Sequence, residues 1–188
     1  MQSTLVVHTL YYFMASDNLT FRDAIESDAS SILQVHSASV RQLCSAHYSK
    51  EQISGWVGRQ SEERFVQLIA RNDDFIVAED GSGRVIGFGH LGPCTDRERF
   101  TSNVNFEVYG FYVSPSVTRR GVGLRLMAEL ERRALEQGCV RLGVCSTLTA
   151  TPFYEACGYI VCKDSHCHSL GGVDLECKVL EKSILEQT

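Results

Sequence analysis

The chain has 188 residues, of which 44% are hydrophobic and 22% charged, as in an ordinary globular domain. Its formal net charge of −5 argues against duplex nucleic acid as a partner, because phosphate binding needs a basic surface. No run of about 18 apolar residues is present, so the sequence predicts no membrane span.

The first residues form an extension that contains no Lys or Arg, and it therefore lacks the basic end of a secretory signal. A short added strand, a disordered tail and a segment outside the native protein all remain open for it. We expect this extension over residues 1–17, a single domain over 18–182 and a tail over 183–188. The eight cysteines include no C-x-x-C pair, which favours reduced thiols and a cytoplasmic protein.

Hydrophobic periodicity predicts a first half made of one strand, two or three helices and a run of antiparallel strands. The second half is predicted as a helix, a strand, a helix and further strands. The predicted strands cover residues 19–22, 75–79, 84–91, 104–113, 140–145, 159–161 and 173–180. Two helices are predicted to begin near Asp28 and Ser49. Three further helices are predicted over residues 62–71, 121–137 and 149–156. An antiparallel first half with a strand–helix–strand unit in the second half is not a doubly wound nucleotide-binding fold.

One local cluster of soft metal ligands lies near the C-terminus, beside Gly171 and Gly172. Its spacing matches no tetrahedral zinc pattern, and we interpret it as a turn and predict no metal site. The cluster consists of Cys162, His166, Cys167 and His168.

The segment that joins the strand ending at Val113 to the long helix has the chemistry of an anion site. Free amides and the helix dipole attract anions at a helix start. Gly121 and Gly123 allow the backbone to approach a pyrophosphate, and Arg119 and Arg120 add cationic groups. A plain tight turn also explains the glycines. The segment lacks both the Lys-Ser/Thr of a Walker loop and the third glycine of a dinucleotide fingerprint.

This segment resembles the GNAT superfamily of acyl-CoA-dependent N-acetyltransferases, in which Val-x-Pro leads to Arg/Gln-x-x-Gly-x-Gly/Ala at the start of a long helix. The chain has this pattern over residues 113–123, with Thr118 where the family has Arg or Gln. Residues 152–159 resemble the family's Phe-Tyr-x-x-x-Gly-Phe/Tyr segment, and Arg22 with Asp28 resembles its opening region. The resemblance extends from residue 19 to residue 180.

The resemblance implies a mixed α/β, GNAT-like fold with a central, mostly antiparallel twisted sheet of six to seven strands and about four flanking helices. It implies an enzyme that moves an acetyl group from acetyl-CoA to a primary amine of a small molecule or peptide by direct attack on the thioester. The alternative is a catalytically weak acyl-CoA-binding sensor or regulatory module. The expected protein is a cytoplasmic monomer or homodimer with no metal, nucleic acid or membrane partner.

The resemblance also implies a coenzyme site. Strand residues Phe111, Tyr112 and Val113 are expected along the acyl arm. The diphosphate is expected at the helix start, on Arg119, Arg120, Gly121, Val122, Gly123 and Leu124. Tyr154 matches the family's tyrosine that faces the coenzyme sulfur, and a phenol with a pKa of about 10 can protonate a departing thiolate.

The general base is the less specific assignment. Glu107 lies at the offset from Val113 at which some family members carry a glutamate base. Strand alternation puts Glu107, Tyr109 and Phe111 on one face unless a bulge intervenes. His90 and a water chain are the alternatives.

The acceptor wall is expected from the first two helices, where Tyr48, Gln52 and Trp56 fall on or near one face; simple core packing is the alternative for them. The charged loop of residues 93–100 either gates the acceptor or is merely solvated.

Overall fold

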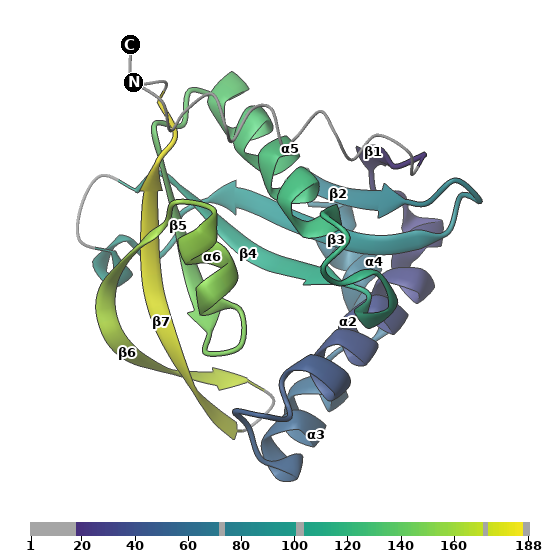
Figure 1. Cartoon of the computed structure of the whole chain (residues 1–188), viewed down its shortest axis with the longest axis horizontal. Helices are drawn as coiled ribbons and strands as arrows, with labels where there is room; N and C mark the ends of the chain where they lie inside the picture. Colours follow the sequence, from purple (N-terminus) through teal and green to yellow (C-terminus); the bar gives the residue numbers. More distant parts are fainter. Residues whose placement is uncertain (1–17, 72–73, 101–103, 171–172, 186–188) are drawn as a thin grey trace.

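The computed structural model describes residues 18–71, 74–100, 104–170 and 173–185, with the backbone alone described for 164–170. Figure 1 shows the arrangement of the helices and strands. The strands are β1 (Thr20–Asp23), β2 (Asp74–Glu79), β3 (Val85–Pro93), β4 (Phe106–Val113), β5 (Arg141–Thr147), β6 (Ile160–Leu170) and β7 (Val173–Ser183). The α-helices are α2 (Ala29–Leu43), α3 (Lys50–Gly58), α4 (Glu62–Ile69), α5 (Val122–Glu136) and α6 (Thr151–Ala156).

The seven strands form one sheet in the order β1-β2-β3-β4-β5-β7-β6. Every neighbouring pair is antiparallel except β4 and β5, which are parallel and joined through α5. The predicted mixed, mostly antiparallel sheet is therefore confirmed, with five α-helices in the described residues where about four were expected. The extension predicted for residues 1–17 and the last three residues of the predicted tail lie outside the described residues.

Helices cover both faces of the sheet (Figure 1). The long helix α5 packs its buried stripe of Leu126, Met127, Leu130 and Ala134 on one face, as the sequence predicts. Gly89 of β3 makes this close packing possible, since a Cβ there would lie 2.6 Å from Leu130 Cδ1. Helices α2 and α4 cover the opposite face through a separate apolar cluster that includes Ile32 and Phe65.

Helix α3 begins with the capping box that the sequence predicts. The Ser49 hydroxyl accepts from the Gln52 amide, and the Gln52 side chain accepts from the Ser49 amide. Two side chains proposed for the acceptor wall instead attach α3 and the residue before its cap to β7. Tyr48 donates to the Glu176 carbonyl at 2.6 Å, and Gln52 donates to the Asp174 carbonyl at 2.8 Å.

Strand β6 is much longer than the sequence suggested. The turn predicted around Cys162 is wrong, because the backbone continues as a strand to Leu170 and pairs with β7. Pairing with a long neighbour stabilises residues that have weak strand patterns of their own. The side chains of His166, Cys167 and His168 lie outside the described residues.

Arg22 of β1 and Asp28, the residue before α2, form a bidentate ion pair. The Arg22 Nη1 and Nη2 atoms lie 2.7 and 2.9 Å from the two carboxylate oxygens of Asp28. The Ile25 amide also donates to Asp28 at 2.9 Å. These contacts lower the pKa of Asp28 below its usual value, the Arg22 hydrogen bond most of all.

Replacing Asp28 by asparagine is expected to destabilise the fold by about 1 kcal/mol, because the partly solvated Arg22 loses one of its two carboxylate partners and keeps only Glu79. The depressed pKa gives the effect a pH dependence: the pair contributes fully above about pH 4, the unfolded value, and is lost at lower pH. Thermal melts of wild type and Asp28→Asn should therefore differ at neutral pH and converge as pH falls. Glu26→Gln, an exposed neighbour, is the matched control.

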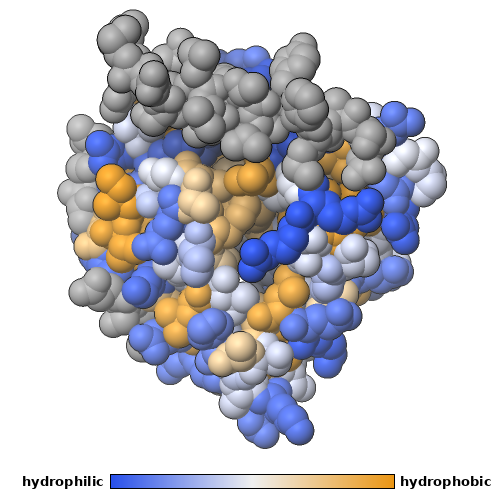
Figure 2. All heavy atoms as spheres, viewed as in Figure 1, coloured by the Kyte–Doolittle hydropathy of each residue, from blue (hydrophilic) through white to orange (hydrophobic). Residues whose placement is uncertain are grey.

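On the face shown in Figure 2, hydrophobic residues lie in separate patches among hydrophilic ones. The described large hydrophobic residues that are exposed come from several different elements. They are Ile25, Tyr109, Leu124, Leu135, Val140, Ile160 and Leu185. No helix in the described ranges is both long and apolar enough to cross a bilayer.

Candidate functional site

The parallel strands β4 and β5 separate partway along their length. Their pairing covers Phe106 to Val108 of β4 with Leu142 to Val144 of β5 and then stops. On its other side β4 stays paired with β3 as far as Val113. The later residues of β4 therefore have one edge that is not paired with β5, as expected for the coenzyme arm.

A tight loop connects the end of β4 to α5. Arg119 has a φ of 62° and Gly121 a φ of 79°, so the loop contains two left-handed residues before the helix. The Thr118 hydroxyl donates to the Pro115 carbonyl at 3.0 Å, which stabilises the loop internally. Arg119 and Arg120 are exposed beside it.

The start of α5 leaves amides available. Among the described residues, no backbone hydrogen bond is donated by Arg119 or by residues 121–124, and the first helical bond runs from the Arg125 amide to the Gly121 carbonyl. Gly123 also lies close to α6, since a Cβ there would be 3.2 Å from Phe153 Cε2. The loop thus presents uncapped amides in a geometry that accommodates an anion.

Tyr154 of α6 is buried among aromatic rings at 4% exposure. Its ring centroid lies 5.4 Å from that of Tyr159 and 6.2 Å from that of Phe111 on β4. Burial raises the pKa of Tyr154 above its ordinary value, and Tyr112 and Cys145 on the diverging strands raise the pKa further. The phenol is consequently protonated at neutral pH.

A β-bulge changes which residues of β4 share a face. Leu91 pairs with Val108 and His90 with Gly110, so Tyr109 is an extra residue in β4. Side-chain alternation reverses there. Phe111 consequently stacks on Phe153 at 5.3 Å on the α6 side, while Glu107 and Tyr109 line a cavity on the other side. The bulge separates Phe111 from Glu107.

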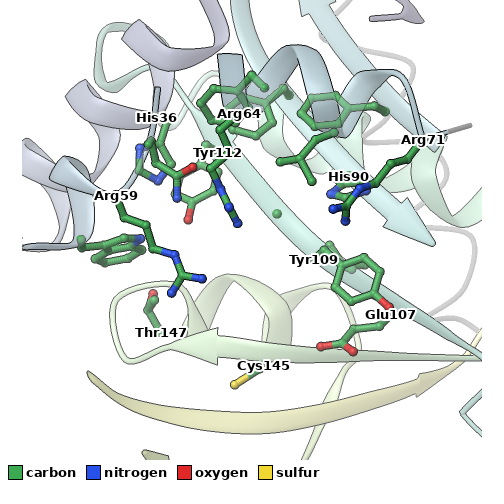
Figure 3. Close-up of a pocket in the computed structure, with 18 of the residues that line it drawn as sticks. His36, Arg59, Arg64, Arg71, His90, Glu107, Tyr109, Tyr112, Cys145 and Thr147 are labelled. Carbon is green, nitrogen blue, oxygen red and sulfur yellow. The ribbon is translucent and has the colours of Figure 1, made fainter. Parts of the chain in front are cut away.

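This cavity has a volume of about 660 Å³ and lies under α2, α3 and α4 (Figure 3). Tyr112 of β4 contributes its ring to the cavity wall, with its centroid 4.6 Å from the His36 ring. Trp56 also lines the cavity, as proposed for the acceptor wall, whereas Tyr48 and Gln52 do not. Arg99, from the charged loop, closes one side.

Glu107 is 2% exposed and pairs with Arg99, whose Nη1 lies 2.8 Å from Oε1. The other carboxylate oxygen, Oε2, is buried and has no partner among the described residues. Burial raises the pKa of Glu107, while Arg99 opposes the shift. A carboxylate with a raised pKa and a free oxygen that faces a cavity has the properties of a general base.

His90, the alternative base, lines the same cavity. Its ring stacks on Phe75 with centroids 5.0 Å apart and lies 5.3 Å from the Tyr109 ring. The structure thus brings both candidate bases to one cavity, His90 from β3 and Glu107 from β4.

Three polar residues that the sequence analysis did not point to also line the cavity: His36, Arg59 and Arg64. His36 belongs to the hydrophobic stripe of α2. A histidine is unusual in such a stripe, and this is the only sequence signal that could have pointed to His36 as a site residue. Arg59 and Arg64 stand at the end of α3 and in the first turn of α4, and no local pattern relates them to Glu107. Within the described side chains, no group of three or more His, Cys, Asp or Glu residues is placed to bind a metal ion.

Comparisons with known proteins identify the family of this chain. A family model for the acetyltransferase (GNAT) family matches residues 39–159. The uncharacterized N-acetyltransferase YafP of Escherichia coli (strain K12) is 25% identical over 155 residues, which cover 82% of this chain and 90% of YafP.

Solved structures show the same architecture. The GCN5-related N-acetyltransferase from Rhodopseudomonas palustris has a TM-score of 0.74 and 25% identity, over 87% of this chain and 94% of that one. The PaiA N-acetyltransferase from Thermoplasma acidophilum, solved with coenzyme A, has a TM-score of 0.70 and 22% identity, over 88% and 99%. The latter similarity concerns the fold.

Proposed function

The chain belongs to the GNAT family of acetyltransferases, and we propose that it transfers an acetyl group from acetyl-CoA to a primary amine by direct attack on the thioester. The observation that carries this proposal is the set of uncapped amides at the start of α5, beside the point where β4 and β5 separate. Acetyl-CoA supplies the activated acetyl group. The residues of this chain supply binding, orientation and proton transfer.

The coenzyme's diphosphate is proposed to bind the amides of residues 121–124, flanked by Arg119 and Arg120. Main-chain donors and the helix dipole together favour a negative charge at this position. The acyl arm is proposed to run along the free edge of β4, at Phe111, Tyr112 and Val113. Amides on that edge can stabilise negative charge on the carbonyl oxygen during attack.

Proton transfer is assigned to two side chains. Glu107 is proposed to accept a proton from the attacking amine, either directly or through one water. As the nitrogen–carbon bond forms and the carbon–sulfur bond breaks, Tyr154 is proposed to donate its proton to the departing sulfur. The buried phenol carries the proton that a donor needs, and Glu107 has one carboxylate oxygen at the cavity without a partner among the described residues.

Binding of acetyl-CoA is expected to raise the melting temperature. At about 100 times the dissociation constant the gain is about 2.7 kcal/mol, which corresponds to roughly 5–10 °C for a chain of this size. Differential scanning fluorimetry measures this shift. Acetyl-pantetheine, which has no diphosphate, should give a much smaller shift.

The double variant Arg119→Gln/Arg120→Gln should lose most of the shift, whereas Arg132→Gln, on the exposed face of the same helix, should keep it. An unchanged melting temperature at millimolar acetyl-CoA would refute the coenzyme site. Release of free thiol with an amine present separates an acetyltransferase from an acyl-CoA sensor, which would bind without turnover.

A further inference from the structure

The wall of the cavity under α3 and α4 carries an excess of positive charge. Arg59, Arg64 and Arg71 line the cavity, and none of their guanidiniums pairs with a carboxylate in the described part of the chain. The acidic residue that lines the cavity, Glu107, is already paired with Arg99. In a chain of formal net charge −5, this local excess favours an anionic ligand.

Figure 3 shows the guanidinium groups of Arg59 and Arg64 directed into the cavity, while Arg71 lies beside His90. Glu107 and Tyr109 lie on a different side of the cavity from His36 and Arg59 (Figure 3). A ligand can therefore place one end near the proposed base and its other end near Arg59 and Arg64.

His36 provides an independent indication of a ligand at the arginine side. It is 2% exposed and lines the cavity, and both ring nitrogens are buried without a hydrogen-bond partner among the described residues. Arg64 Nε is also buried and unpartnered. Buried polar atoms in native proteins are nearly always hydrogen-bonded, so unpartnered donors at a cavity wall indicate a missing acceptor.

The surroundings of His36 are apolar and aromatic. Its ring centroid lies 6.2 Å from Trp56 and 6.1 Å from Phe65, in addition to the contact with Tyr112. Burial in this cluster lowers the pKa of His36 to about 4, so the imidazole is neutral and one nitrogen carries a proton that it can donate. An apolar wall lowers the local dielectric constant, so the attraction between the arginines and an anionic ligand is stronger beside it.

We propose that the acceptor amine carries an oxyanion, a carboxylate or a phosphate, at the end opposite its amino group, and that Arg59 and Arg64 bind this oxyanion with His36 as a further donor. Guanidinium groups recognise both oxyanions through paired hydrogen bonds. This inference rests on the proposed acetyl transfer, since it specifies the acceptor. The anion is not the coenzyme's diphosphate, because none of residues 119–124 lines this cavity.

Two chain-matched pairs of amines test the proposal and distinguish the two oxyanions. ε-Aminohexanoate is compared with ε-aminohexanamide, and aminohexyl phosphate with aminohexanol. Thiol release from acetyl-CoA gives kcat/KM for each amine. Fluorescence of Trp56, the sole tryptophan, gives binding of each amine without turnover.

The anionic member of at least one pair is expected to exceed its neutral partner in kcat/KM by roughly tenfold or more, as one charged hydrogen bond provides. Arg64→Gln and Arg59→Gln should each weaken binding of the anionic amine by roughly tenfold and leave the neutral amine almost unchanged. Arg64→Lys should restore part of the loss. Arg41→Gln, exposed on α2 and outside the cavity, is the matched control.

The outcomes separate this inference from the proposed function. Equal use of the anionic and neutral amines, with equal sensitivity to the arginine variants, overturns the oxyanion site and leaves acetyl transfer standing. Arginine-dependent binding of the anionic amine without any thiol release overturns acetyl transfer and supports the oxyanion site. If Arg64→Gln does not fold, Arg59→Gln, at the exposed end of α3, provides the same test.

Discussion

Replacing Tyr154 by phenylalanine is expected to lower kcat by about 100-fold, at the lower end of what general-acid catalysis contributes. The departing thiolate then loses its proton donor. The ring contacts with Phe111, Phe153 and Tyr159 remain, so coenzyme affinity and the melting temperature should stay close to wild type. Steady-state kinetics and calorimetric titration with coenzyme A measure these quantities.

Tyr159 offers a matched control in the same cluster. It is 3% exposed, and its hydroxyl contacts Met127 Sδ at 3.5 Å rather than the gap between β4 and β5. Tyr159→Phe should therefore keep most of kcat. If Tyr154→Phe retains the wild-type kcat, or if both variants lose the same amount, Tyr154 is a packing residue and the thiolate is protonated by another group.

The second large effect is expected for Glu107→Gln, which should lower kcat/KM by about 100- to 1000-fold, because the attacking ammonium loses its proton acceptor. Arg99 keeps Asp96 as a partner at 3.2 Å, so its charge is not left isolated. Burial raises the pKa of Glu107, and the wild-type kcat/KM should rise with pH as this carboxyl ionises. The variant should lack that rise.

The pH profile also identifies the alternative base. If Glu107→Gln keeps the shape of the wild-type profile, the rise of kcat/KM with pH reflects the ionisation of another group. His90 is then the candidate, because it lines the same cavity. His90→Gln should then remove the rise of kcat/KM with pH. With Glu107 as the base, His90→Gln should change kcat/KM much less and preserve the dependence on pH.

The elements around the proposed coenzyme site could be predicted from the sequence, because their signals are local. Glycines beside arginines at a helix start and the apolar stripe of α5 each act within a few residues of the chain. The acceptor side could not be predicted in this way. Glu107 was a sequence candidate, but His36 and Arg64 line the same cavity as Glu107 only because α2 and α4 pack over β4.

The sequence by itself determined the order of the elements, the start of α5 and the family pattern around it, because helix periodicity, capping and turn chemistry depend on neighbouring residues. The tertiary structure decided which face each β4 side chain occupies, since one extra residue at Tyr109 reverses the alternation relative to β3. It also decided the length of β6, which pairing with β7 extends to Leu170. Register and pairing depend on the partner strand, whose position the local sequence does not encode.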